Sequence, residues 1–127
     1  MPVTTTQRIR EAKEQVQNLS PEQVASELEN GALLVDVREA EERYQNGVIP
    51  GSVHMPRGML EFYADPELPY HREELQQDRR IILHCAGGGR SALGAALLQE
   101  MGYTNVAHLD GGLSGWRDAG QPVANIG

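Results

Sequence analysis

Hydrophobic positions along the chain follow two patterns, which predict two kinds of element. Short runs of mostly apolar residues are typical of strands buried in a sheet, and apolar residues three or four apart are typical of amphipathic helices. The predicted strands are residues 32–35, 52–55, 81–84 and 105–109. The predicted helices are residues 4–18, 21–30, 39–45, 57–63, 71–77, 91–101 and 111–119. Because strands alternate with helices, we expect an α/β domain whose parallel sheet is covered on both faces.

The second predicted helix has clear start and stop signals. Ser20 suits the N-cap, Pro21 suits the first helical position, and Gln23 completes a capping box with Ser20. Asn30 and Gly31 form a C-terminal stop signal. The strand that follows is therefore expected to begin close to residue 32.

The first predicted helix, residues 4–18, is polar and has only a thin apolar stripe. The stripe consists of Ile9, Ala12, Val16 and the following Leu19. Such a helix usually docks on the flank of a domain, and an arm that binds a partner protein is the alternative. We divide the chain into a helical extension, residues 1–18, and a domain, residues 19–127.

Composition narrows the functional classes. The chain has 127 residues, a formal net charge of −7 and one cysteine. This length suits one domain, and the negative charge argues against binding to nucleic acid or to a membrane surface. One cysteine excludes an internal disulfide, a zinc site with several thiolates and a Cys-x-x-Cys pair. With no apolar run near the roughly 18 residues of a membrane span and no signal-peptide core, we expect a protein of the reducing cytoplasm.

Metal and cofactor sites are not expected. Glu39, Glu41 and Glu42 are close together, but no histidine has matching metal-ligand spacing. Acidic residues in the first turn of a helix instead suit its dipole and a solvated face. We therefore predict neither a metal nor an organic cofactor.

The cysteine lies between a predicted strand and a predicted helix, in the segment Cys85-Ala86-Gly87-Gly88-Gly89-Arg90-Ser91. Glycine lets a backbone turn tightly and point N–H groups at a ligand. Those N–H groups, a helix N-terminus and Arg90 would all face the sulfur of Cys85. Surroundings of this kind lower the pKa of a thiol from about 8.5 and increase its nucleophilic thiolate form. The loop therefore predicts an activated cysteine in an anion cradle, although a lone cysteine is usually an inert buried thiol.

A dinucleotide site is one alternative for this loop. Gly87, Gly89 and Ala92 fit the pattern G-x-G-x-x-G/A, and Asp110 ends the next predicted strand. That pattern normally opens a domain with several further strand–helix units, whereas only 17 residues follow Asp110. The pattern also leaves the cysteine without a role, so we disfavour it.

A cysteine phosphatase or arsenate reductase is the second alternative. Those enzymes also hold an oxyanion with loop amides and an arginine, but five residues separate their cysteine from the arginine. Only four separate Cys85 from Arg90. The shorter loop disfavours phosphoryl chemistry without excluding it.

Three other residues near the ends of predicted strands are candidates for the site. Function gathers at the carboxyl ends of strands in open α/β sheets, where Asp36 and Arg38 are expected. They could support the cysteine loop or form a purely structural ion pair. Arg57 could reach the rim as a second anion contact. His84 should point to the face opposite Cys85, because side chains alternate along a strand, and we assign it a structural role.

Taken in order, several of these segments resemble the rhodanese family of sulfurtransferases. The resemblance covers about residues 20–123 and leaves the N-terminal helix outside. An ordered set of motifs is more specific than any one of them. The matching segments are residues 34–39, 47–56, 85–91, 102–106, 109–112, Trp116 and residues 120–123.

The resemblance implies a single rhodanese domain, with a five-stranded parallel sheet and the catalytic cysteine in the loop after the central strand. The family reaction moves a sulfane sulfur from a donor such as thiosulfate to a thiol or cyanide through a cysteine persulfide. Its expected partners are this small anionic donor and acceptor, and a protein sulfur acceptor is a further option. A persulfide carrier or docking module with little turnover of its own is the alternative function.

The resemblance also implies roles for the candidate residues. Cys85 and Arg90 would be catalytic, with Arg90 attracting the anionic donor and steadying the leaving sulfite. Asp36 and Arg38 would hold the loop in place. Substrate binding would fall to Ala86, Gly87, Gly88, Gly89, Ser91 and Arg57.

Overall fold

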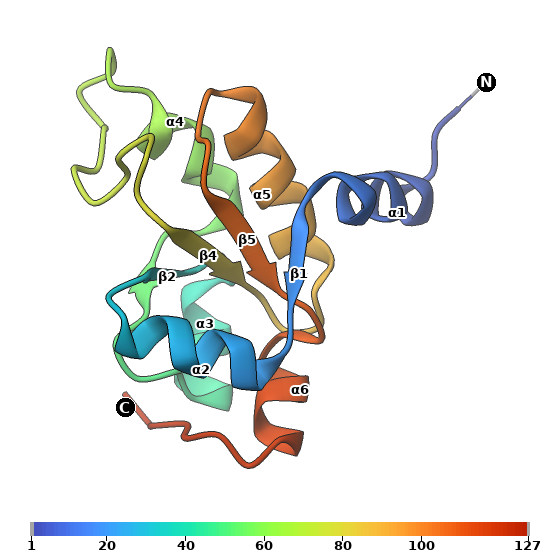
Figure 1. The fold of residues 1–127 in the computed structure, drawn as a ribbon, viewed down its shortest axis with the longest axis vertical. Helices are drawn as coiled ribbons and strands as arrows, with labels where there is room; N and C mark the ends of the chain where they lie inside the picture. Colours follow the sequence, from blue (N-terminus) through green and yellow to red (C-terminus); the bar gives the residue numbers. More distant parts are fainter. Residues whose placement is uncertain (1, 127) are drawn as a thin grey trace.

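A computed structural model describes residues 2–126, which fold into a sheet with helices on both sides (Figure 1). In chain order the elements are α1 (Thr5–Gln15), β1 (Gln17–Leu19), α2 (Pro21–Glu29), β2 (Leu33–Asp36), α3 (Ala40–Asn46), β3 (Val53–His54), the 3₁₀ helix η1 (Arg57–Met59), α4 (Leu60–Ala64), β4 (Ile81–His84), α5 (Gly89–Glu100), β5 (Val106–Leu109) and α6 (Gly112–Asp118). The predicted alternation of strands and helices is confirmed.

The sheet has five strands in the order β1-β5-β4-β2-β3, with β4 in the middle. Every neighbouring pair is parallel. The five-stranded parallel sheet that the family resemblance implied is therefore confirmed. Because the strands are parallel, β2, β4 and β5 end at the same edge, and the loops that follow them lie together there.

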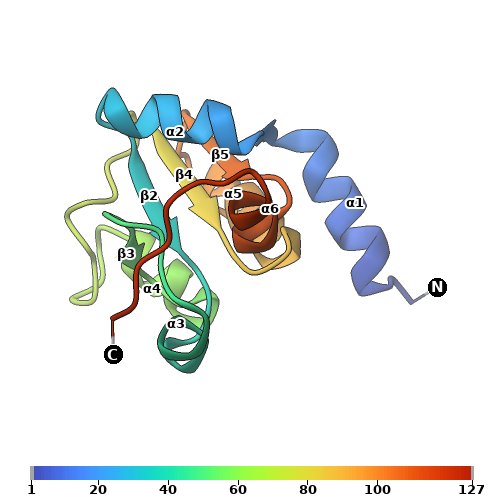
Figure 2. The ribbon, with the colours of Figure 1, turned by 90° about the horizontal axis from the view of Figure 1, so that it is seen from below.

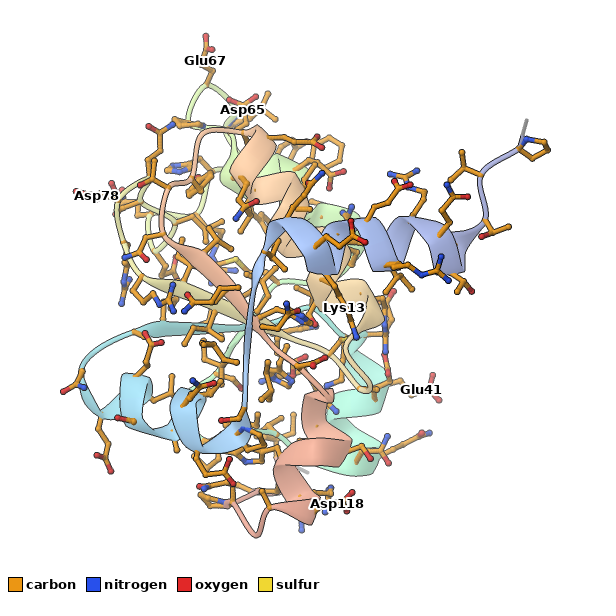
Figure 3. All side chains as sticks on the ribbon, turned by 45° about the vertical axis from the view of Figure 1, so that its right-hand side comes forward. Lys13, Glu41, Asp65, Glu67, Asp78 and Asp118 are labelled. Atoms are coloured by element: carbon orange, nitrogen blue, oxygen red, sulfur yellow. The ribbon has the colours of Figure 1, made fainter. Side chains whose placement is uncertain are left out.

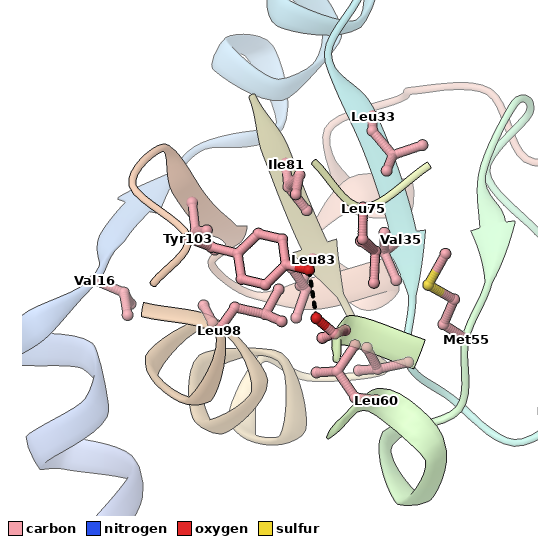
Figure 4. Close-up of a cluster of buried hydrophobic side chains, with 14 of the residues drawn as sticks. Val16, Leu33, Val35, Met55, Leu60, Leu75, Ile81, Leu83, Leu98 and Tyr103 are labelled. Atoms are coloured by element: carbon pink, nitrogen blue, oxygen red, sulfur yellow. Dashed lines mark hydrogen bonds between the residues drawn. The ribbon is translucent and has the colours of Figure 1, made fainter. Parts of the chain in front are cut away.

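The central strand is buried on both faces, as expected for a parallel sheet. Ile81 and Leu83 pack with residues of α4 and α5 on one face, and Ile82 packs with residues of α2 and α6 on the other. On the first face the Tyr103 hydroxyl donates to the carbonyl of Ala64 over 2.7 Å, which joins the end of α4 to the segment after α5 (Figure 4).

The start of α2 follows its predicted cap. The Ser20 hydroxyl accepts the N–H of Gln23, and the Gln23 side chain accepts the N–H of Ser20, so both halves of the capping box form. Asn30 is the C-cap, and Gly31 follows with φ of +93°. The sequence signals for this helix are confirmed at both ends.

The N-terminal segment differs from its prediction. The helix ends at Gln15, and Gln17–Leu19 form a strand instead of a last helical turn. Asn18 explains the change, because its amide nitrogen donates to the carbonyls of Lys13 (2.9 Å) and Val16 (3.2 Å) and so caps the end of α1. β1 then pairs with β5, while α1 packs along α5 at the flank of the molecule (Figure 2).

β1 therefore crosses the boundary predicted at residue 18. The division of the chain into an extension and a domain stays a prediction. The pairing of β1 with β5 nevertheless makes residues 17–19 a part of the sheet.

The helix predicted over residues 71–77 is wrong, since this segment forms turns. The Arg72 N–H donates to the Tyr63 carbonyl over 3.0 Å, and its guanidinium pairs with Glu74, only two positions away. Residues two apart lie on different faces of a helix, so this pairing belongs to a non-helical backbone. Arg72 also lies over the ring of Tyr63, 5.4 Å from its centroid.

Acidic side chains project from several parts of the surface, as Figure 3 shows for Glu41, Asp65, Glu67, Asp78 and Asp118. These five side chains belong to different loops and helices. Within residues 2–126, no helix is long and apolar enough to cross a membrane.

Candidate active site

Cys85 follows β4 directly, and α6 holds its peptide group in place. The Leu113 N–H donates to the Cys85 carbonyl over 2.9 Å, and the Ser114 N–H donates to the Ala86 carbonyl over 3.2 Å. Gly112 precedes these two donors and packs against the same backbone. The first turn of α6 thus fixes the start of the cysteine loop.

Two amide donors and one hydroxyl acceptor of the loop surround the sulfur of Cys85. The Gly88 N–H lies 3.1 Å from Sγ and the Ser91 N–H 3.4 Å, while the Ser91 hydroxyl oxygen lies 3.5 Å away. Gly88 has φ of +110°, a conformation that L side chains rarely adopt, and it precedes the first residue of α5. The loop therefore aims amides at Sγ, as the sequence predicts for an activated cysteine.

The other loop residues lie around this centre in different ways. Cys85 itself is only 1% exposed, whereas Ala86 and Gly87 are exposed at the tip of the loop. Gly89 is partly buried against Ile9 of α1, which a Cβ at this position would approach to 3.0 Å. Of the loop residues predicted to bind substrate, Gly88 and Ser91 contact Sγ, Ala86 and Gly87 are exposed, and Gly89 packs against α1.

Arg90 is held by a residue that the sequence analysis did not assign to the site. Its guanidinium makes two hydrogen bonds to the Glu42 carboxylate of α3, 2.8 and 2.9 Å long. These bonds hold the pKa of Glu42 at about 2 and raise the pKa of Arg90. Because 48 residues separate the partners, sequence spacing gives no signal for this pair.

Asp36 and Arg38 form a buried ion pair. The Arg38 Nε lies 3.0 Å from Asp36 Oδ1 and its Nη2 lies 2.9 Å from Oδ2 and 2.8 Å from the Gly47 carbonyl. Arg43, which sequence reasoning missed, adds a contact of 2.7 Å to Asp36 Oδ2. Burial alone would raise the pKa of Asp36, but hydrogen bonds from Arg38 and nearby positive charge hold it at about 2.

Arg38, one member of this ion pair, also borders the cysteine loop. Arg38 and Ala86 line one cavity of about 470 Å³, which includes Leu113 and Ser114 of α6 and Arg117. Arg38 therefore lines the space beside the cysteine loop, and Asp36 holds its guanidinium in place. Whether it supports the chemistry of the loop stays a prediction.

The polar contacts of Arg57 and His84 are with groups other than the amides that face Sγ. Arg57 pairs with Glu61 over 2.9 Å and lines a groove between α1 and α5, so its predicted role as an anion contact stays untested. His84 is fully buried, with its Nε2 3.6 Å from Asp36 Oδ2. Burial lowers the pKa of His84, consistent with the structural role that we predicted.

A buried histidine that the sequence analysis did not single out lies behind the loop. The Nδ1 of His108, on β5, is 2.9 Å from the Ser91 hydroxyl, and its Nε2 is 2.7 Å from Asn18 Oδ1. Burial lowers the pKa of His108 to about 4. The sequence held one signal for this role, namely a histidine near the carboxyl end of the predicted strand 105–109, where site residues are expected. A histidine that only packs in the core would give the same signal.

The pKa of His108 predicts an acid-sensitive fold. An ordinary histidine titrates near 6.5, so the unfolded chain binds this proton first as the pH falls. Stability from His108 is therefore complete above pH 6.5 and is lost towards pH 4, by about 3 kcal/mol in the free energy of unfolding. Denaturant unfolding between pH 7 and pH 4 measures this loss. In His108→Asn this loss of stability between pH 7 and pH 4 should be smaller. If the free energy of unfolding of the variant depends on pH as strongly as that of the wild type, His108 is not the cause of the loss.

No group of three or more His, Cys, Asp or Glu side chains within residues 2–126 could hold a metal ion. The groups around Cys85 are its own thiol, the amides of Gly88 and Ser91, the Ser91 hydroxyl and, nearby, the Arg90 guanidinium. These groups can bind a small anion next to a nucleophilic sulfur.

Most of the chain is similar to the proteins of one family. The family model for the rhodanese-like domain matches residues 20–119. The thiosulfate sulfurtransferase GlpE of Pseudomonas savastanoi pv. phaseolicola is 35% identical over 100 residues, which are 78% of this chain and 85% of that protein. A sulfurtransferase of Allochromatium vinosum is 33% identical over 91 residues, covering 72% of this chain and 77% of its own.

A solved structure from Rhodopseudomonas palustris matches nearly the whole molecule. It has a TM-score of 0.89 and 39% identity, and the match covers 97% of this chain and 98% of that one. That protein is described as one of unknown function and a possible tyrosine phosphatase. The match extends beyond the family model at the N-terminus.

Proposed function

The chain belongs to the rhodanese-like domain family, and from this membership we propose that it is a sulfurtransferase that carries sulfur as a persulfide on Cys85. The observation that supports this role most directly is the pair of amides from Gly88 and Ser91 directed at the buried sulfur. Thiosulfate is the proposed donor, as the name of the Pseudomonas savastanoi relative and the small anion site suggest. A thiol or cyanide is the proposed acceptor, because either is a nucleophile for the outer sulfur of a persulfide. The cytoplasmic setting stays a prediction.

In the proposed first half-reaction, the Cys85 thiolate attacks the outer sulfur of thiosulfate. The new Sγ–S bond forms as the S–S bond of thiosulfate breaks, and sulfite leaves with the electron pair. In the second half-reaction an acceptor thiolate or cyanide attacks the outer persulfide sulfur, and the Cys85 thiolate leaves. Sulfur changes partners in both steps, so no external oxidant or reductant is required.

The loop supplies the electrostatic part of this reaction. The N–H groups of Gly88 and Ser91 stabilise negative charge on Sγ. Ala86 and Gly87 are exposed, so an anion from solvent can reach this part of the loop. Arg90 is close enough to Cys85 for their charges to interact, and its side chain is 39% exposed. A dianionic donor can therefore reach this guanidinium from solvent.

The chain has one cysteine, so a sulfur held on Cys85 can only leave to an outside acceptor. A thiol on a partner protein would serve as well as a small thiol. This is the alternative role as a persulfide carrier, and catalytic turnover distinguishes the two. An enzyme turns over thiosulfate and cyanide repeatedly, whereas a carrier transfers one sulfur and stops unless its partner is present.

A cysteine phosphatase or arsenate reductase is the second candidate, and the description of the Rhodopseudomonas palustris protein as a possible tyrosine phosphatase favours the phosphatase. The spacing of four residues between Cys85 and Arg90 argues against it here. Hydrolysis of an aryl phosphate or reduction of arsenate would support that candidate.

Intact mass spectrometry tests the proposed function. After incubation with thiosulfate alone, the protein should become one sulfur atom heavier, and addition of cyanide or a thiol should return it to its original mass. An unchanged mass after exposure to several sulfane donors would contradict the proposal.

Substitution of Arg90 by glutamine should raise the KM for thiosulfate about tenfold and change kcat less, because a charged hydrogen-bond donor to the substrate is lost. Steady-state kinetics with thiosulfate and cyanide measure this. Glu42→Gln is the matched control, because it removes the ion pair while leaving the arginine in place. If Glu42→Gln raises the KM equally, the ion pair holds the loop and Arg90 does not bind the donor.

A further inference from the structure

Behind the sulfur of Cys85, side chains from three elements form a continuous row. Ser91 of α5 lies 3.5 Å from Sγ, His108 of β5 lies 2.9 Å from Ser91, and Asn18 of β1 lies 2.7 Å from His108. Ser91 and His108 are both fully buried. The row therefore connects the reacting sulfur to the N-terminal strand of the sheet, and the proposed half-reactions do not yet use it.

Asn18 fixes the direction of every hydrogen bond in this row. Its amide nitrogen donates to the carbonyls of Lys13 and Val16, so its oxygen faces His108 and can only accept. The Nε2 of His108 must then carry the hydrogen. In a neutral imidazole the other nitrogen, Nδ1, is an acceptor, and the Ser91 hydroxyl donates its hydrogen to it.

His108 stays neutral in this arrangement. Burial is the main cause that lowers the pKa of His108 to about 4. The charge of Asp110 raises this pKa and the charge of Lys13 lowers it, both to a smaller extent. Asp110 and Lys13 lie 3.1 Å apart as an ion pair, so their effects on the imidazole largely offset each other. Lys13 extends from α1 on the side of the molecule turned forward in Figure 3.

The Ser91 hydroxyl has one hydrogen, and His108 holds it. Its oxygen therefore turns a lone pair towards Sγ and accepts the S–H of the resting thiol, while Sγ accepts the N–H groups of Gly88 and Ser91. When the thiol ionises, the sulfur keeps the two amides and gains no third donor from the hydroxyl.

We propose that His108 is a positioning residue that keeps the Ser91 hydroxyl hydrogen away from the Cys85 sulfur, with Asn18 fixing the tautomer that does so. The N–H groups of Gly88 and Ser91 then stabilise the thiolate without a third hydrogen bond from the hydroxyl. A thiolate with fewer hydrogen-bond donors forms at a higher pH but is a stronger nucleophile, and the best attacking thiol titrates near the ambient pH. The row thus limits how strongly the anion cradle stabilises the thiolate.

His108→Gln is the variant that tests this role. A glutamine is long enough to place its amide at Asn18 but has no acceptor where Nδ1 lay, so the Ser91 hydroxyl can turn to the sulfur. A third donor to the thiolate should move its titration midpoint to lower pH by about one unit. The ultraviolet absorbance of the thiolate measures this midpoint, and because the chain has one cysteine, a Cys85→Ser variant provides the blank.

Two controls separate this effect from a general disturbance of the fold. His108→Asn is short enough to offer an amide oxygen to Ser91, so its midpoint should stay at the wild-type value. In a Ser91→Ala background there is no hydroxyl to release, so adding His108→Gln should change nothing.

If His108→Gln fails to fold, as judged by circular dichroism, Asn18→Ala takes its place, because Asn18 is exposed and its loss frees the tautomer. A smaller shift in the same direction is then expected. A midpoint that rises in either variant would show that His108 instead receives the cysteine proton through Ser91, and would overturn the proposal. An unchanged midpoint, or a shift that persists without Ser91, would overturn it too.

This inference rests on Cys85 as the reacting group of the proposed function. The titration contains no sulfur donor, however, so its result is independent of whether thiosulfate is the substrate. Sulfur loading could fail while the midpoint still shifts, and the converse could also occur.

Discussion

Replacement of Cys85 by serine should abolish both the gain of sulfur from thiosulfate and the formation of thiocyanate from cyanide. A serine hydroxyl ionises far above the pH range of the protein and cannot form a persulfide, so turnover should fall by at least about 1,000-fold. Intact mass and a thiocyanate assay, run on the same samples, measure the two losses together.

The fold should tolerate this change, because a hydroxyl is smaller than a thiol and can still accept the N–H groups of Gly88 and Ser91. A thermal unfolding transition close to that of the wild type would confirm that the loss is chemical. Sulfur retained by the serine variant would locate the carrier elsewhere and contradict the proposed role of Cys85.

Replacement of Gly112 by alanine should damage both the fold and the site. A Cβ on Gly112 would lie 2.5 Å from the Ala86 carbonyl oxygen and 2.6 Å from that of Cys85. Both atoms are backbone, so no side chain can rotate away, and the φ of +59° adds strain of its own. Together these costs should reduce the free energy of unfolding by about 2–4 kcal/mol. Denaturant unfolding measures this loss.

The same variant should lose most of its sulfurtransfer activity even where it is folded, because the backbone that must move carries Cys85. Gly120→Ala is the matched control, since its φ is +78° but nothing lies within 4 Å of a Cβ there. It should cost about 1 kcal/mol and leave activity unchanged. Equal effects of the two variants on stability and activity would mean that the contact with the loop is unimportant.

The parts of the site that lie close together in sequence could be predicted from it. The apolar run before Cys85 and the glycines after it predict a strand, a tight loop and a helix N-terminus, and the structure contains all three. The charged pair of Asp36 and Arg38 follows in the same way from its position after a buried strand. In each case the neighbours in sequence are also the neighbours in space.

The remaining parts depend on contacts between distant segments. Glu42 reaches Arg90 across 48 residues, and Asn18 reaches His108 across 90. β1 has three residues, too few to show a strand pattern of its own. The apolar stripe of the preceding helix continues as far as Leu19, so the sequence does not show that α1 ends at Gln15, where the Asn18 side chain caps it. Such features are set by the assembled sheet, and local propensity does not reveal them.

The strand order has a consequence for the sequence of events during synthesis. β1 is the first of the five strands to be synthesised, yet within residues 2–126 it pairs only with β5, the last of the five. A growing chain can build β2, β3 and β4 together with the cysteine loop while β1 still has nothing to pair with. The environment of Cys85 is therefore completed only when β1 and β5 pair, so a product truncated before β5 would contain Cys85 and Ser91 without the His108 that holds the Ser91 hydroxyl.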